Sequence, residues 1–246
     1  DTYVFGRGYG SDSLEEDAGT NGSPTDKVAF GAGIALADLI LSRAGNDLVI
    51  TISATTDQLT VKNQFFTSPL NGILSAEYRV DSFAFADGST LSATDLDSRT
   101  LLASETSGND TILGVDTAET LDGGAGNDTL QGNAGSDIDG VGRDYGQDTI
   151  NETSAAFGSL ADTVTFKLGV APSDIQFVRS GMDLILKIAG TLDQLTIQQQ
   201  FSSIDSSSLS GKNRIESFTF ADGTAWTATD VEAKTLLAAL SSGNDA

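Results

Sequence analysis

The sequence predicts an all-β chain in which two copies of one β-rich module, each ending in a short helix, flank a run of nine-residue repeats. Three observations predict this organisation. Short apolar runs of strand type recur, the chain matches itself at an offset of about 136 residues, and four nine-residue blocks run in phase from Glu105 to Gly140. We therefore expect a first module over residues 1–104, the repeats over 105–150 and a second module over 151–246.

Short strands are expected to build each module. Apolar or alternating segments of strand length lie at 48–52, 58–61, 82–85 and 184–188. Two Asp-Gly pairs, at 87–88 and 222–223, are expected to end strands as turns.

Each module is expected to close with a helix, near 94–103 and 229–240. The spacing of Thr94 to Asp97, and of Thr229 to Glu232, is that of a capping box, with a hydroxyl at the N-cap and an acid three residues later. We expect two leucine pairs to face the module cores: Leu101 with Leu102, and Leu236 with Leu237.

The duplication covers most of the chain. Arg43, Gly45 and Asp47 match Arg179, Gly181 and Asp183 at an offset of 136, as Asp26 matches Asp162. After a loop shortened by one residue, the segment 83–88 returns at 218–223 with an offset of 135. Two modules with a shared pattern are expected to share a fold.

The nine-residue blocks carry the chemistry. Residues 123–131 read Gly-Gly-Ala-Gly-Asn-Asp-Thr-Leu-Gln and fit Gly-Gly-x-Gly-x-Asp-x-U-x, in which U is a large apolar residue. Each block has an acid at position six: Asp110, Glu119, Asp128 and Asp137. The turn residues that accompany these acids as candidate metal-site residues are Gly108, Asn109, Gly123, Gly126, Asn127 and Gly135.

This arrangement suits calcium, a hard cation that takes six to eight oxygen ligands from carboxylates, backbone carbonyls and water. Glycine allows the backbone to reach positive φ and to point carbonyl groups inward. The apolar residue at position eight is expected to face a thin core.

The pattern resembles the calcium-binding nonapeptide of RTX proteins, and the segments 26–96 and 162–231 resemble the domain found beside such repeats in haemolysin-type proteins. The resemblance implies a right-handed parallel β-roll in which two nonapeptides form one coil. Asp110 would then stack over Asp128, and Glu119 over Asp137, with Ca²⁺ bound between stacked turns.

Two further turns extend the candidate site. The turn at 143–150 contains Gly146 and Asp148, and its counterpart at 7–14 contains Gly10 and Asp12. Asp128 and Asp148 are 20 residues apart rather than 18, which predicts a bulge between coils.

Composition excludes several classes of function. Acids outnumber bases 35 to 13, for a net charge of −22, so we expect no nucleic-acid partner. No apolar run approaches the ~20 residues of a membrane span, so we expect no membrane insertion. The chain has no cysteine and no histidine, which excludes disulfides, Ser-His-Asp and Cys-His catalysis and histidine-bound zinc.

Three classes of function stay open. The first is a non-enzymatic, calcium-binding structural module of a large secreted or cell-surface protein, which folds on calcium after type I export. The second is an adhesin module that binds a carbohydrate or a cell surface. The third is a polysaccharide-active enzyme fragment that uses paired acids. Because the chain ends in Gly243-Asn244-Asp245, the start of another motif, we expect a fragment whose partners include neighbouring repeats.

Overall fold

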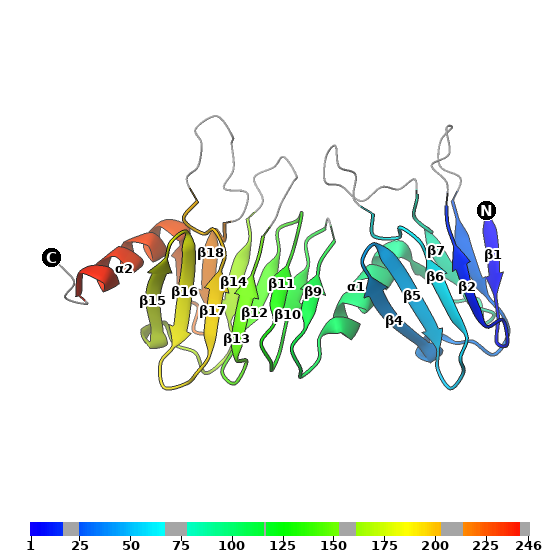
Figure 1. Ribbon diagram of the computed structural model, residues 1–246, viewed down its shortest axis with the longest axis horizontal. Helices are drawn as coiled ribbons and strands as arrows, with labels where there is room; N and C mark the ends of the chain where they lie inside the picture. Colours follow the sequence, from blue (N-terminus) through cyan, green and yellow to red (C-terminus); the bar gives the residue numbers. More distant parts are fainter. Residues whose placement is uncertain (17–24, 67–77, 116, 153–160, 203–213, 242–246) are drawn as a thin grey trace, which may run out of the picture. The chain divides into compact units, whose positions relative to one another are not determined.

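The computed structural model describes residues 1–16, 25–66, 78–115, 117–152, 161–202 and 214–241, so the motif at 243–245 lies outside the described residues. The chain forms two compact units, Asp1–Ser104 and Glu105–Ala246, which Figure 1 colours from blue to green and from green to red. The expected division into three domains stays a prediction.

The first sheet of the second unit joins the nonapeptide strands to the module strands. Its order is β15 (Ile175–Ser180), β16 (Asp183–Ile188), β17 (Gln194–Ile197), β13 (Gln147–Ile150), β11 (Thr129–Gln131) and β9 (Thr111–Leu113). The strands β9, β11, β13 and β17 pair in parallel, while β16 pairs antiparallel with both β17 and β15. Figure 1 shows these strands following one another across the unit.

The second sheet of this unit also joins nonapeptide strands to module strands. Its order is β10 (Thr120–Asp122), β12 (Ile138–Val141), β14 (Thr163–Phe166), β18 (Ser217–Phe220) and β19 (Ala225–Thr227). All pairs are parallel except β18 with β19. Successive nonapeptide strands alternate between the two sheets, as the coils of a β-roll require.

Register stacks the position-eight side chains into two buried columns. One column contains Ile112, Leu130, Ile150 and Ile197, each no more than 1% exposed. The other contains Leu121, Asp139, Val164 and Phe218, each 0% exposed. The expectation that Ile112, Leu121 and Leu130 point inward is therefore confirmed. Three-residue strands bury their apolar face only because the next coil covers it.

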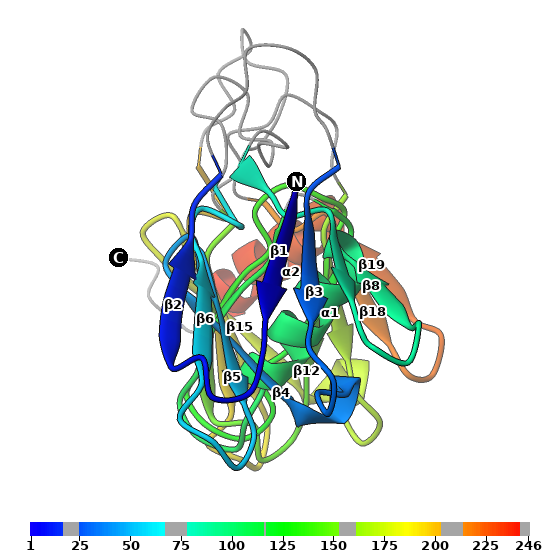
Figure 2. The same cartoon turned by 90° about the vertical axis from the view of Figure 1, so that its right-hand side faces the viewer.

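The first unit repeats the module. One of its sheets runs β1 (Thr2–Phe5), β3 (Lys27–Phe30), β7 (Ser82–Ala84) and β8 (Thr90–Ser92). The other runs β2 (Ser11–Leu14), β6 (Gln58–Val61), β5 (Asp47–Ile52) and β4 (Leu39–Ala44). Figure 2 shows β2 and β6 on one side and β3 and β8 on the other. A 3₁₀ turn precedes the β-hairpin in both copies, at Leu36–Asp38 and Pro172–Asp174.

Each module ends in a helix, α1 (Ala93–Ser104) or α2 (Ala228–Ser241), which packs on β4 or β15 respectively. The expected all-β fold, with a parallel β-roll and duplicated modules that each end in a helix, is confirmed. The expected capping residues are wrong by two positions. Asp95 Oδ2 accepts a hydrogen bond from Ser92 N at 3.0 Å, and Asp230 Oδ2 accepts one from Thr227 N at 2.8 Å. The helices begin earlier because the preceding strand ends at the capping hydroxyl.

The expected inward leucine pairs are also wrong for three of the four residues. Leu102, Leu236 and Leu237 are 67%, 65% and 67% exposed. The buried face of α1 consists instead of Leu96, Asp97 and Thr100. Asp97 can lie inward because Arg79 pairs with it at 2.6 Å, and this pairing fixes the rotation of the helix.

Candidate calcium centre

Stacked carboxylates join successive coils in the second unit. Asp128 Oδ1 accepts a hydrogen bond from the backbone nitrogen of Asp110 at 2.8 Å, and Asp148 Oδ1 accepts one from that of Asp128 at 3.0 Å. Each acid thus holds the backbone of the acid one coil earlier. The three side chains form a ladder along one edge of the roll.

A second ladder runs along the other set of turns. Asp137 Oδ1 accepts from Glu119 N at 2.8 Å, and Asp162 Oδ1 accepts from Asp137 N at 3.0 Å. Glu216 Oε2 then accepts from Asp162 N at 2.9 Å. The ladder therefore continues from the nonapeptides into the module.

Sequence reasoning missed Asp162 and Glu216 as members of this ladder. They lie outside the nine-residue period, because the coils that carry them contain long insertions. The duplication could have pointed to them, because both copies have an acid at each of these two positions. In the first unit the equivalent pair, Asp26 and Asp81, makes the same contact, with Asp26 N donating to Asp81 Oδ2 at 2.7 Å.

Burial makes these carboxylates costly. Asp128, Asp137 and Asp148 are 1%, 0% and 5% exposed. Asp128 Oδ2 and Asp137 Oδ2 are buried and have no hydrogen-bond partner among the described residues. An unpaired buried carboxylate oxygen is expensive unless a proton or a cation neutralises it.

The pKa values follow from this burial. Desolvation raises the pKa of Asp137 to about 6 and that of Asp148 to about 7, and neighbouring carboxylates add to the shift. Desolvation also raises the pKa of Glu119 to about 7 and that of Glu216 to about 7. The pKa of Asp128 is raised for the same reason.

Glycines let the turns approach closely. A Cβ at Gly126 would lie 2.2 Å from Gly108 O and 2.9 Å from Asp128 Oδ1, and one at Gly146 would lie 2.0 Å from Gly126 O. A Cβ at Gly135 would lie 2.8 Å from Asp137 Oδ1, and one at Gly123 would lie 2.3 Å from Asp128 Oδ2. Carbonyl and carboxylate oxygens of adjacent turns therefore crowd around positions that only glycine can occupy.

The asparagines form a third ladder. Asn109 Oδ1 accepts from Asn127 N at 2.8 Å, and Asn127 Oδ1 accepts from Gln147 N at 2.8 Å. These amides fix the spacing of the turns from the outside, since Asn127 is exposed. The structure thus brings together the candidate residues of the second unit.

Gly10 and Asp12 lie in the first unit, where the surroundings differ. Asp12 is on β2 and is exposed. Gly10 N donates to Asp57 Oδ1 at 2.8 Å, and Gly146 N donates to Asp193 Oδ1 at 3.0 Å in the second unit. Asp57 and Asp193, which open the repeated Asp-Gln-Leu-Thr segments at 57–60 and 193–196, therefore each hold an earlier glycine turn.

An acid replaces the apolar residue in one core column. Asp139 stands at position eight of its nine-residue block, and in the strand register it lies between Leu121 and Val164. It is fully buried, and neither carboxyl oxygen has a hydrogen-bond partner among the described residues. Burial raises the pKa of Asp139 well above its ordinary value, with the neighbouring Glu152 adding to the shift.

Glu152 is 2% exposed, and burial raises its pKa to about 8. The equivalent residues in the first unit are Tyr3 and Glu16, and a hydrogen bond to Glu16 raises the pKa of Tyr3 to about 12. The second copy thus replaces a phenol–carboxylate pair by two carboxyl groups.

The donors present fit calcium. Within the described ranges, no three acidic side chains converge on one point. The stacked turns instead offer carboxylate oxygens in pairs together with the carbonyls of Gly108 and Gly126. An all-oxygen donor set of this kind favours a hard cation over zinc or copper.

Family comparisons agree with this chemistry. The haemolysin-type calcium binding protein related domain matches residues 47–95 and 183–230. The RTX calcium-binding nonapeptide repeat matches residues 113–138. The first matches contain the duplicated module strands, and the second contains Glu119, Asp128 and Asp137.

Two known proteins show partial similarity. The chain is 31% identical over 125 residues to the iron-regulated protein FrpA of Neisseria meningitidis serogroup C, a match that covers 51% of this chain and 10% of that protein. The crystal structure of the extracellular lipase LipA from Serratia marcescens aligns with 84% of this chain and 34% of the lipase chain. Its sequence identity is 17% and its TM-score is 0.22, which supports no argument about fold or function.

Neither helix in the described ranges has the length and hydrophobicity needed to span a bilayer. RTX repeats bind calcium and occur in secreted proteins. The chain therefore carries RTX calcium-binding nonapeptide repeats and two copies of the haemolysin-type calcium binding protein related domain.

Proposed function

We propose that the chain is a calcium-dependent structural module of a larger secreted or cell-surface protein and that it folds on binding calcium after export. The observation that carries this proposal is the pair of buried, unpartnered oxygens, Asp128 Oδ2 and Asp137 Oδ2, within ladders of stacked carboxylates.

Calcium would stabilise the fold because it removes the main cost of forming the ladders. With a net charge of −22, the chain opposes its own compaction, and stacking acids at successive coils adds local repulsion. A bound divalent ion offsets both. Since an ion that binds the folded state stabilises it by mass action, a rise in free calcium would favour folding.

We assign the binding groups to the stacked turns. The carboxylates of Asp110, Asp128 and Asp148 would serve one edge of the roll, and those of Glu119, Asp137 and Asp162 the other. The glycines at 108, 126, 135 and 146 would contribute backbone carbonyls. Asp12 and Gly10 would take the same roles in the first unit.

The acids of the module motifs support a structural role rather than catalysis. Asp47 Oδ1 and Asp183 Oδ1 accept hydrogen bonds from Asn63 N and Gln199 N at 2.9 and 2.8 Å. Asp87 Oδ1 accepts from Ser89 N at 2.8 Å in a turn. These carboxylates hold the backbone, so their recurrence in both copies follows from the fold.

The adhesin alternative stays open, and its support differs between aromatic residues. Trp226 packs against Phe220 at a centroid distance of 4.5 Å and is covered by Lys234 Nζ at 4.5 Å, as expected for a packing role. Tyr9 is 54% exposed, although its ring contacts Phe5 edge-on.

A titration of the chelated chain with calcium, followed by far-ultraviolet circular dichroism, tests the proposal. We expect a cooperative gain of β signal as calcium rises, and no such gain with magnesium at equal concentration. Full β content in excess chelator, with no response to calcium, would contradict it.

A further inference from the structure

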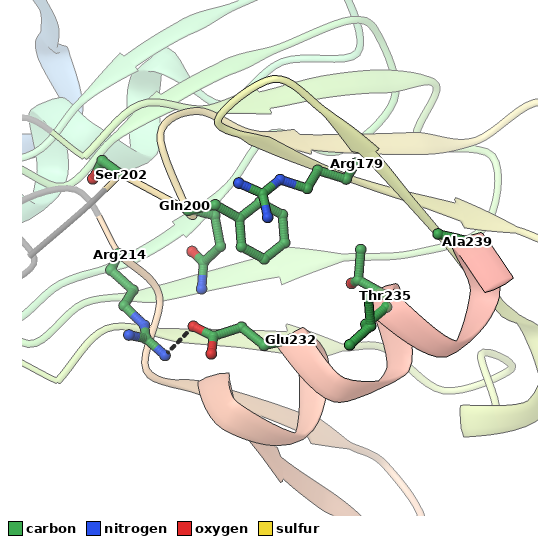
Figure 3. A pocket seen from close by; sticks show the side chains of 9 residues that line it. Arg179, Gln200, Ser202, Arg214, Glu232, Thr235 and Ala239 are labelled. Carbon is green, nitrogen blue, oxygen red and sulfur yellow. Dashed lines mark ion pairs between the residues drawn. The ribbon is translucent and has the colours of Figure 1, made fainter. Parts of the chain in front are cut away.

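A cavity lies beside α2 in the second unit. Its volume is about 540 Å³, within the range of small-molecule sites. The residues that line it come from β15, from the turn after β17, from the segment before β18 and from α2: Arg179, Gln200, Phe201, Ser202, Arg214, Glu232, Thr235, Leu236 and Ala239. Figure 3 shows Arg179 and Arg214 extending into this space from different sides, with Glu232 reaching from α2 toward Arg214.

The cavity is locally positive in a strongly acidic chain. Two arginines face one glutamate, which leaves one net positive charge against a chain total of −22. Two guanidinium groups in one cavity are unusual for a chain in which acidic residues outnumber basic ones 35 to 13. It would attract an anion that the rest of the surface repels.

The two guanidinium groups are held in different ways. Arg179 lies over the Phe201 ring at 4.5 Å and donates from Nε to Gly181 O at 3.0 Å. Arg214 pairs through Nη2 with Glu232 at 2.8 Å, while its Nε is buried and has no partner among the described residues. A buried donor without an acceptor is costly and is satisfied by a ligand that brings one.

The duplicated module provides an internal comparison. Phe66 in the first unit and Ser202 in the second have the same place, since Phe66 N donates to Asn63 O at 3.0 Å and Ser202 N to Gln199 O at 2.9 Å. Phe66 contacts Tyr78 edge-on at 5.3 Å. The second copy therefore has a serine where the first copy has an aromatic ring.

The arginine–acid ion pair beside the helix is also more exposed in the second unit than in the first. In the first unit the Arg79 and Asp97 side chains are 13% and 6% exposed, whereas those of Arg214 and Glu232 are 20% and 42% exposed. The second module keeps both arginines, and its ion pair is more exposed than that of the first.

We propose that this cavity binds a carboxylate-bearing sugar, such as a uronate residue of a polysaccharide. The planar fork of an arginine matches a carboxylate, and Arg214 Nε, which has no acceptor within the part of the chain that the structure describes, is the donor that such a group would take. The Glu232 carboxylate can accept hydrogen bonds from ring hydroxyl groups, and the Ser202 hydroxyl can donate or accept them. Leu236 and Ala239 provide an apolar wall for the face of the ring.

The test uses the calcium-loaded full chain, with free calcium held constant, and sodium glucuronate as the probe. Nitrogen-15 NMR follows the arginine Nε–H signals, and calorimetry gives the dissociation constant. We expect a saturable shift of the Arg214 signal with glucuronate. The response should be much weaker with glucose, which lacks the carboxylate, and with acetate, which lacks the sugar ring.

Two pocket variants and one control variant separate the pocket from the fold. Ser202→Phe restores the ring of the first copy and should weaken glucuronate binding about tenfold or more, as should Arg214→Gln, because each removes a favourable contact. Arg43→Gln, the equivalent of a change at Arg179 but in the first unit, should leave binding unchanged. Retained melting temperatures in calcium show that the variants are folded.

Three results would overturn the proposal: no saturable binding, equal affinity for glucose and glucuronate, or a loss with Arg43→Gln as large as that with Ser202→Phe. None of these bears on calcium binding, which is measured separately by the circular dichroism titration.

Discussion

The carboxylate of Asp128 accepts a hydrogen bond from the backbone nitrogen of Asp110, 18 residues earlier, at 2.8 Å, and the backbone nitrogen of Asp128 donates in turn to Asp148. Asp128 therefore belongs to two successive coil contacts. Its Oδ2 atom remains buried without a partner among the described residues. This central place in the ladder determines the first prediction.

Asp128→Ala should reduce calcium affinity more than Asp12→Ala. Asp128 is 1% exposed and lies between two stacked acids, whereas Asp12 is exposed on β2. Calorimetric titration of both variants measures the difference. Equal losses would count against a binding site built from stacked turns.

Without calcium, the chain should be more stable in weak acid than at neutral pH. Burial raises the pKa of Asp137 to about 6 and those of Asp148 and Glu216 to about 7 in the folded state, above the ordinary values of 3.8 and 4.5. An acid with a raised folded pKa contributes stability that is complete below its unfolded pKa and lost as pH rises through the folded pKa. The melting temperature in chelator should thus fall between roughly pH 4 and pH 8.

Calcium should reverse this dependence, because the ion requires ionised carboxylates. Melting curves at several pH values, with chelator and with excess calcium, measure both slopes. A calcium-free melting temperature that rises over the same pH interval would show that the ladder acids are not buried as described.

Asp139→Leu should stabilise the calcium-free chain by about 1–3 kcal/mol at neutral pH, because it removes an unpaired buried carboxyl group and restores an apolar residue to the column. Leu121 and Val164 flank the position in register. Denaturant unfolding in chelator measures the effect. A loss of stability, in contrast, would show that the Asp139 carboxyl group holds a stabilising partner.

Gly146→Ala should destabilise the chain far more than Gly223→Ala. Both glycines have positive φ, 96° and 87°, so alanine is strained at each by about 1–2 kcal/mol. Only at Gly146 would the new Cβ meet a backbone oxygen, Gly126 O at 2.0 Å, whereas nothing lies within 4 Å at Gly223. Unfolding in saturating calcium gives the two free energies, and similar values would mean that the turns can move apart.

Sequence reasoning could predict the parts of the fold that repeat locally. The nine-residue period predicted that Ile112, Leu121 and Leu130 are buried, because each is the middle residue of a short strand whose side chain points to the opposite face from those of its two neighbours. It could not predict Asp162 or Glu216, since insertions carry them to 25 and 54 residues from their hydrogen-bond partners. Neither could it set the rotation of α1, which depends on the long-range pair of Arg79 with Asp97 rather than on the spacing of leucines.

The nine-residue pattern also did not predict that a buried acid, Asp139, would stand in an apolar core column. A period defines which position faces inward but not whether the side chain there is apolar. The offset of 136 residues aligns Asp139 with Tyr3, but only the structure shows that Asp139 is buried without a hydrogen-bond partner among the described residues.

The direction of the ladders has a consequence for the order of folding. Every acid holds the coil on its N-terminal side, and the last acids of the ladder belong to the module, whose antiparallel hairpin of β15 and β16 is built from contacts close in sequence. Local hairpins form before strands that need a distant partner. Assembly of the second unit should therefore begin near the hairpin of β15 and β16 and proceed coil by coil toward Glu105, with each new coil docking on a row of carboxylates already in place.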